Sequence, residues 1–239
     1  MEVVQNSLNK KYWEFKNQTS TEADLYLYIE IAWWGAGYAA HSAQSFKAEL
    51  DALGEIQKLN IYINSPGGDV FEALAIHNML KRKQYTKNVY VDGLAASAAS
   101  VVAMAGDKII MPSNTMMMIH NPWTSGEGFA KDFRDLADRL DKAAESMRQT
   151  YLEKTNGKME EKELIKLLDA ETWLTAQECY DYGLCDEIAT SKQVAAKYTG
   201  ELFNKYKNTP GQLIEMKKVD SEKLNKIKIT VIDGLSKGE

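Results

Sequence analysis

One serine and one histidine in this sequence stand where an α/β protein presents reactive groups. His120 follows the apolar run 116–119, and Ser97 lies between an expected strand and a run of small residues that favours a helix. A chain leaves the buried sheet at the ends of its strands, so side chains there can reach a substrate. A serine hydroxyl needs a base to take its proton before it becomes a good nucleophile. The pair therefore indicates nucleophilic catalysis, although two serines of a closely packed helix, Ser97 and Ser100, are an equally good interpretation of that segment alone.

The turn 64–68, Asn-Ser-Pro-Gly-Gly, follows another expected strand. Glycine adopts backbone conformations that other residues avoid and leaves its N–H accessible. That N–H, together with the N–H of the residue after Ser97, would stabilise the negative oxygen formed when the serine attacks a carbonyl. An ordinary turn is the alternative interpretation.

A catalytic histidine also needs a carboxylate that orients it. Asp169 and Glu171 are the candidates, and either is also compatible with a plain charge at a helix end. The other two histidines carry no such argument. His77 falls on the apolar face of an expected helix, which is typical of a buried structural histidine, and His41 has no evident partner in the sequence.

Hydrophobic periodicity predicts the elements that position these groups. Alternation predicts strands over residues 25–31 and 59–63, and helical spacing predicts helices over 42–54 and 70–82. Strands followed by helices in this rhythm predict an α/β fold with parallel strands joined by crossover helices. Further strands are expected over 89–91, 108–111, 115–119 and 184–188, and further short helices over 96–105 and 176–182, the last opened by a capping box at Thr175.

Residues 129–151 predict one long amphipathic helix. Its apolar positions recur every three or four residues, and at about 1.5 Å per residue it would be about 35 Å long. Such a stripe packs either within its own domain or against another subunit. The sequence alone leaves both possibilities open.

Composition limits the function classes. The 239 residues carry 29 Lys+Arg against 34 Asp+Glu, a net charge of −5, so a nucleic-acid partner is not expected. No apolar run of membrane-spanning length occurs, so we also expect no membrane partner. The two cysteines, Cys179 and Cys185, form no metal-binding pattern, which fits a reducing compartment. We expect no metal and no cofactor, and, because a Walker-type phosphate-binding motif is absent, no ATPase domain in this chain.

Four segments, in the same order, resemble the Clp protease proteolytic subunit family and its wider ClpP/crotonase fold. They are the glycine turn 64–68, the serine segment 93–97, the histidine segment 118–122 and the segment 173–178. Leu94 departs from the pattern, since the housekeeping enzymes usually carry Gln there. The resemblance implies a repeated β-β-α spiral over residues 25–190 with a protruding handle helix over 129–155. It leaves out an N-terminal arm, 1–24, and a basic C-terminal extension, 191–239, with ten lysines against six acidic residues. The polar residues 1–22 are also compatible with a first edge segment of the sheet.

The resemblance also assigns roles residue by residue. Ser97 would be the nucleophile and His120 the general base, and the backbone N–H groups of Gly68 and Ala98 would form the oxyanion hole. Residues 121–128 would be a strand and loop beside the substrate, with Asn121, Trp123 and Gly126 as substrate-binding residues. The handle helix would join subunits into a ring.

The third member of the triad is where the sequence departs from the family. The family carries an aspartate two residues before an aromatic residue, and Trp173 takes the aromatic place here, so Glu171 falls at the acid position. Asp169 has the expected side chain but lies two residues too early. Glu171 is the better candidate, Asp169 is the rival, and a site with neither acid remains possible.

Within the family, the sequence is most similar to the ClpP-like prohead (head maturation) proteases of tailed bacteriophages. Residues 69–76, 98–100, 104–107, 120–123 and 171–173 carry that resemblance. It implies a serine endopeptidase that cleaves scaffold, capsid or portal segments inside the assembling prohead, in the cytoplasm of the bacterial host. Two other functions stay open, which are a crotonase-type enzyme acting on an acyl-CoA and a non-catalytic structural ring in the capsid.

Overall fold

A computed structural model describes residues 11–31, 42–190 and 206–210. The chain divides into two compact units, residues 1–196 and 197–239. Residues 206–210, the described part of the second unit, contain neither helix nor strand. Most of the predicted extension 191–239 and the first ten residues of the predicted arm therefore lie outside the described residues.

In the described part of the chain, eight strands form one sheet in the order β1-β2-β3-β4-β5-β8, and β6 pairs with both β4 and β7. Strands β2 to β5 run parallel, as the alternation of strands and helices predicts. The strands are β1 Glu14–Lys16, β2 Glu22–Leu27, β3 Lys58–Ser65, β4 Thr86–Ala96, β5 Lys108–Pro112, β6 Met116–Ile119, β7 Thr172–Thr175 and β8 Glu187–Ala189.

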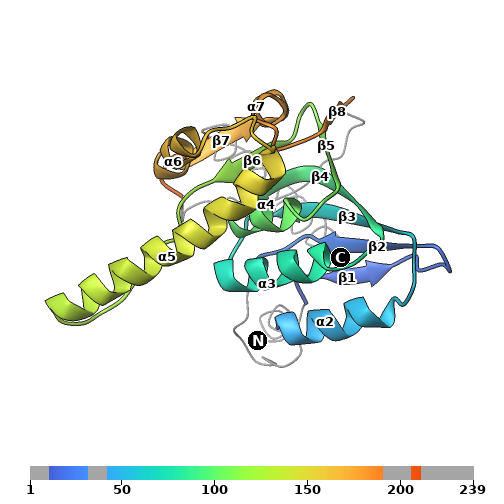
Figure 1. The fold of residues 1–239 in the computed structure, drawn as a ribbon, viewed down its shortest axis with the longest axis horizontal. Helices are drawn as coiled ribbons and strands as arrows, with labels where there is room; N and C mark the ends of the chain where they lie inside the picture. Colours follow the sequence, from blue (N-terminus) through green and yellow to red (C-terminus); the bar gives the residue numbers. More distant parts are fainter. Residues whose placement is uncertain (1–10, 32–41, 191–205, 211–239) are drawn as a thin grey trace, which may run out of the picture. The chain divides into compact units, whose positions relative to one another are not determined.

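Helices α3 and α4 lie beside the central strands of the sheet in Figure 1, α2 lies below β1, and α6 and α7 lie beside β7. Asp69 caps α3 through bonds from the N–H groups of Phe71 and Glu72, and the predicted capping box at Thr175 opens α7. The helices are α2 Ala43–Ala52, α3 Val70–Lys81, α4 Ala98–Ala103, α5 Ala130–Thr155, α6 Glu161–Asp169 and α7 Ala176–Tyr182.

The two faces of the sheet differ in chemistry. Leu25, Ile61 and Val89 lie on the face that packs into the core, and each is fully buried. The alternate positions on the other face include Tyr26, Tyr62 and Tyr90, whose rings stack across neighbouring strands with centroids 4.8 and 5.1 Å apart. This alternation fixes the register of the central strands, because a slip of one residue would exchange the two faces. None of the helices in these described ranges has the length and apolarity needed to cross a membrane.

Strand β4 is longer than the sequence indicates, and the difference matters for the site. Alternation predicts a strand over 89–91, whereas β4 continues through Gly93 as far as Ala96. Pairing with β3 on one side and with β5 and β6 on the other supplies hydrogen bonds that override the weak strand propensity of this segment. The next helix, expected over 96–105, therefore begins only at Ala98.

Two other expectations need correction. Residues 121–128, expected as a strand and loop, contain no strand. The helix α6 is absent from the sequence prediction, although its buried residues Leu164 and Leu168 have helical spacing.

The described part of the N-terminal segment contains the edge strand β1, which pairs antiparallel with β2. Trp13, just before β1, is buried in the core.

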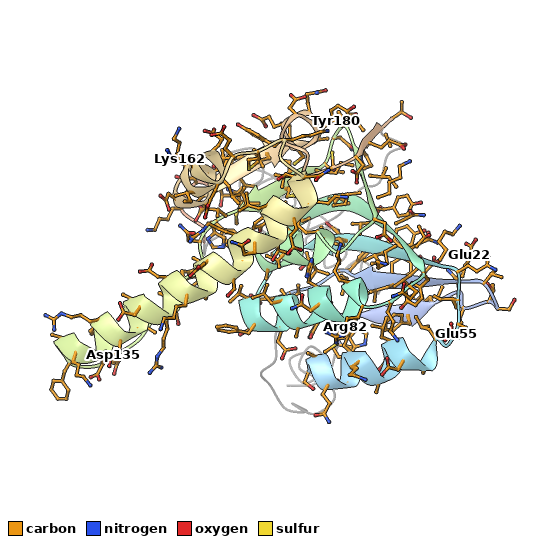
Figure 2. The ribbon with its side chains drawn as sticks, viewed as in Figure 1. Glu22, Glu55, Arg82, Asp135, Lys162 and Tyr180 are labelled. Atoms are coloured by element: carbon orange, nitrogen blue, oxygen red, sulfur yellow. The ribbon has the colours of Figure 1, made fainter. Side chains whose placement is uncertain are left out.

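The long helix α5 is present and longer than its apolar pattern, since it continues to Thr155 and ends at Asn156 in a left-handed conformation. Its carboxyl-terminal half packs into the core through Met147 and Tyr151. Its amino-terminal half extends away from the sheet in Figure 1, and Asp135, labelled in Figure 2, lies on that projecting part.

Candidate active site

Ser97 occupies a sharp turn between β4 and α4, which we call the elbow and define as residues 96–98. Its φ of 53° and ψ of −125° are unusual for a residue with a side chain. Such a conformation stores about 1–3 kcal/mol of strain and persists only where the surroundings hold it. Two backbone bonds do so here: the Ser97 N–H donates to the carbonyl of Met118 at 2.7 Å, and the Ser100 N–H donates to the carbonyl of Ser97 at 2.9 Å.

His120 reaches the same point from the neighbouring strand. β6 runs parallel to β4, with Ala96 opposite Met118, so the two strands end at the same edge of the sheet. The Ser97 Oγ lies 2.7 Å from the His120 Nε2, which is hydrogen-bonding distance. If the serine donates to Nε2, the neutral imidazole carries its proton on Nδ1. A hydroxyl and a base in this geometry can transfer a proton directly, as nucleophilic attack requires.

The two candidate acids lie in different environments. The exposed Asp169, at the end of α6, accepts a hydrogen bond from the side-chain amide of Asn121 at 2.6 Å. Glu171 is half-buried and directly precedes β7, which pairs antiparallel with β6. The last pair of that ladder joins Ile119 to Thr172, and one further step in the same register sets Glu171 opposite His120. Residues opposite each other on antiparallel strands lie on the same face.

The glycine turn packs directly on the elbow. A Cβ on Gly67 would lie 2.5 Å from the carbonyl oxygen of Ala96 and 2.7 Å from the Cβ of Ser97, so no larger residue fits there. Gly68 is equally confined, because its Cβ would lie 1.8 Å from the carbonyl oxygen of Ile31. The sequence indicated a special turn here, and the structure gives its physical reason.

The backbone N–H of Gly68 is not used in the bonds that hold the glycine turn. Ile31, which follows the end of β2, forms an isolated parallel bridge with Gly68: the Ile31 N–H donates to the Gly67 carbonyl, and the Asp69 N–H donates to the Ile31 carbonyl, both at 2.8 Å. Because the bridge uses the groups of Gly67 and Asp69, the N–H of Gly68 is not directed at Ile31. The N–H of Ala98, the first residue of α4, has no partner within its own helix.

The residues expected beside the substrate lie in the irregular segment after His120. Trp123 is 58% exposed and free to contact another molecule, and a Cβ on Gly126 would lie 3.4 Å from Leu136, so this segment runs along α5. Asn121 is used internally, since its side chain binds Asp169 and its backbone N–H donates to the carbonyl of Leu168 at 3.3 Å.

Two contributors to the site were not found from the sequence. Ile31 supports the glycine turn through backbone groups, which leave no trace in residue type. Tyr151 falls on the apolar stripe predicted over 129–151, but its hydroxyl lies 2.7 Å from the Oγ of Ser100. A tyrosine among aliphatic residues was the available signal, because a buried phenol group usually finds a hydrogen-bond partner.

The described residues hold neither a metal cluster nor a reactive thiol. Over 11–31, 42–190 and 206–210, no group of three or more His, Cys, Asp or Glu side chains is arranged to hold a metal ion. Both cysteines are buried, and burial raises the pKa of Cys185 to about 11 and that of Cys179 well above its ordinary value. Their thiols therefore stay protonated near neutral pH, which is the unreactive form.

A family model described as Clp protease matches residues 17–192 of this chain. The chain belongs to the Clp protease family. The match includes the elbow, His120 and both candidate acids. It also includes residues 17–24, which lie outside the range 25–190 over which the motifs resemble the family. Membership also makes the chain a serine-type peptidase rather than an acyl-CoA enzyme of related fold, and the mixed α/β architecture agrees with the ClpP fold.

Curated relatives carry the same description. The chain is 32% identical over 158 residues to an ATP-dependent Clp protease proteolytic subunit of Bacteroides fragilis, which covers 65% of this chain and 75% of the relative. It is 33% identical over 150 residues to proteolytic subunit 2 of Treponema denticola, covering 60% of this chain and 72% of the relative. A third, from Bacteroides thetaiotaomicron, is 28% identical over 158 residues, covering 65% of this chain and 70% of the relative.

Proposed function

We propose that this Clp-family chain is an endopeptidase in which Ser97 is the nucleophile, His120 the general base and Glu171 the acid that orients the histidine. The observation that carries the proposal is the 2.7 Å approach of the Ser97 Oγ to the His120 Nε2 at a strained elbow. The cross-strand position of Glu171 supports it over Asp169, whose carboxylate already accepts a bond from Asn121.

The reaction follows from these positions. The Oγ of Ser97 attacks the carbonyl carbon of a peptide bond while its proton passes to the Nε2 of His120. The carbonyl oxygen becomes an oxyanion between the N–H groups of Gly68 and Ala98. His120 then gives the proton to the departing amine, which leaves an acyl ester on Ser97. Water attacks this ester, His120 takes the water's proton and returns it to Ser97, and the acid product departs.

The substrates proposed are head-assembly proteins of a tailed phage: scaffold, capsid or portal segments cleaved within the prohead, in the cytoplasm of the bacterial host. The segments that resemble the prohead protease branch support this, notably residues 69–76 after the glycine turn and 171–173 around the acid.

A ring-shaped homo-oligomer joined through α5 is proposed as the working form. Its own unit leaves two large apolar side chains exposed at the start of this helix: Phe129, the residue before α5, is 85% exposed, and Phe133 is 49% exposed. Large apolar side chains left exposed close together are typical of subunit contacts.

Hydrolysis of an unstructured protein substrate tests the proposed function. Ser97→Ala should reduce the cleavage rate by about 10⁴–10⁶-fold and leave the fold intact, because loss of the nucleophile removes the covalent route. Ser113→Ala, at an exposed serine between β5 and β6, is the matched control and should cleave normally. Equal cleavage by wild type and Ser97→Ala would contradict the assignment. A folded oligomer with no cleavage at all would favour a structural ring.

Mass spectrometry of the purified chain tests whether it is its own substrate. If the extension 191–239 is removed by the same site, the wild-type chain should be shorter than the Ser97→Ala chain. Identical masses for the two would show that the extension is not processed by Ser97.

A further inference from the structure

Two buried hydroxyl groups behind the elbow have no role in the chemistry proposed above. Ser100 lies in α4 and Tyr151 lies in α5, and both are fully buried. Their oxygens are 2.7 Å apart. A hydroxyl group is costly to bury without a hydrogen bond, and each hydroxyl of this pair has the other as its partner. Apolar side chains could pack α4 against α5 without that requirement, so the pair calls for an explanation beyond packing.

The direction of these bonds follows from counting protons. The Ser100 Oγ donates to the carbonyl oxygen of Ser97 at 2.6 Å. A serine hydroxyl has one proton to donate, so in the pair with Tyr151 the tyrosine is the donor and Ser100 the acceptor. Burial raises the pKa of Tyr151, which keeps this proton in place at any ordinary pH. The chain of bonds therefore runs from Tyr151 through Ser100 to the backbone of the nucleophile.

The carbonyl of Ser97 is linked rigidly to the N–H of Ala98. The two groups belong to one peptide unit, which is planar, and they are directed to opposite sides of it. The Ser97 carbonyl accepts two hydrogen bonds from Ser100, one from its side chain and one from its N–H at 2.9 Å. Fixing the carbonyl in this way fixes the direction of the Ala98 N–H. Bonds accepted by a carbonyl also polarise its peptide unit and strengthen the N–H as a donor.

We propose that Tyr151 and Ser100 form a hydroxyl relay that positions and polarises the Ala98 N–H toward the oxyanion. Both are positioning residues, since neither reaches the substrate. This inference rests on the proposed function, because the oxyanion forms only if Ser97 attacks. It links α5 to the transition state through a chain of two hydrogen bonds and predicts an effect on reaction rate rather than on substrate binding.

The test uses a fluorophosphonate probe on the full-length chain and separates its maximal rate of labelling from its half-saturating concentration. The variants are Tyr151→Phe, Ser100→Ala and the double variant Ser100→Ala with Tyr151→Phe. The double variant guards against misfolding, because it removes both hydroxyls and leaves neither buried without a partner. Tyr85→Phe is the matched control, since it removes a buried tyrosine hydroxyl that has no hydrogen-bond partner in the described structure.

Tyr151→Phe removes one hydrogen bond of the relay and is expected to lower the maximal labelling rate about five- to tenfold, with an unchanged half-saturating concentration. Ser100→Ala and the double variant remove both bonds and should lower the maximal rate at least as much. Tyr85→Phe should label like the wild type. Wild-type labelling rates in Tyr151→Phe and in the double variant would overturn the inference. A lower labelling rate in Tyr151→Phe, together with a wild-type rate in the folded double variant, would overturn it as well. Failure of the wild-type chain to label would instead count against the proposed nucleophile.

Discussion

At the scale of single residues, the site depends on which carboxylate orients the His120 ring. Asp169 has the side chain that the family pattern favours, but it lies on an exposed helix end and binds Asn121. Glu171 has one more methylene group, and its φ of 50° turns the chain just before β7. The longer side chain and the altered backbone are therefore found together, which is consistent with a glutamate serving where an aspartate is usual.

Substitution of each acid by its amide separates the two candidates. Glu171→Gln should lower the rate of peptide cleavage by about 10²–10⁴-fold, because a neutral amide no longer stabilises the imidazolium that forms during attack. Asp169→Asn keeps an oxygen that accepts the bond from Asn121, so its activity should stay close to that of the wild type. The reverse pattern, with the loss in Asp169→Asn, would show that the acid is assigned wrongly.

The two cysteines should not react with thiol reagents in the folded chain. Burial disfavours the charged thiolate and raises the pKa of Cys185 to about 11, so at pH 8 only about one molecule in a thousand carries the thiolate. Iodoacetamide at pH 8 should therefore modify neither cysteine in the folded chain, and both should react after denaturation. Rapid modification of the native chain, followed by mass spectrometry, would contradict this account of their environment.

At the scale of elements, the site is made by strand ends that meet at one edge of the sheet. The alternation of apolar residues predicts β3, because one face of this strand is buried in the core and the other is not. The alternation of strands with helices predicts the parallel order of β3 and β4. The ends of β4 and the start of α4 could not be predicted in the same way. They depend on pairing with β6, which is distant in sequence, and on a strained Ser97 that no propensity favours.

The contact between glycine turn and elbow gives a prediction about stability. Gly67→Ala places a Cβ 2.5 Å from the Ala96 carbonyl at a φ of +89°, so it should lower the free energy of unfolding by about 2–4 kcal/mol and disturb labelling of Ser97. Gly54→Ala is the matched control, since φ is +67° but nothing lies within 4 Å of the added atom, and about 1 kcal/mol is expected. Denaturant unfolding measures both. Equal decreases in the free energy of unfolding for the two variants would mean that the glycine turn is not closely packed against the elbow.

At the scale of the whole molecule, α5 divides into a buried half and a projecting half. Periodicity predicts the helix but cannot say what covers its stripe, because a pattern of apolar residues looks the same within a domain and between subunits. In the structure, the carboxyl-terminal half of α5 packs within its own domain, because Met147 and Tyr151 are buried in the core. Phe129 and Phe133 stay exposed within this unit, and we propose that a second subunit covers them.

Replacing an exposed apolar residue of α5 tests the proposed ring. Phe133→Asp should shift the sedimentation coefficient toward smaller species, because a charge in an apolar subunit contact is poorly solvated. The thermal unfolding of the separated subunit should change little, since this side chain is 49% exposed within its own unit. Glu145→Ala, an exposed position off the stripe, is the control. An unchanged sedimentation coefficient for Phe133→Asp would remove α5 from the assembly contact.

The central claim is that one serine, activated by one histidine, performs the chemistry. Peptide mapping after treatment of the folded chain with a fluorophosphonate tests it most directly. We predict a single adduct on Ser97, lost in Ser97→Ala, strongly slowed in His120→Gln and unchanged in Ser113→Ala. An adduct on another residue, or a folded wild-type chain that takes up no probe, would contradict the account.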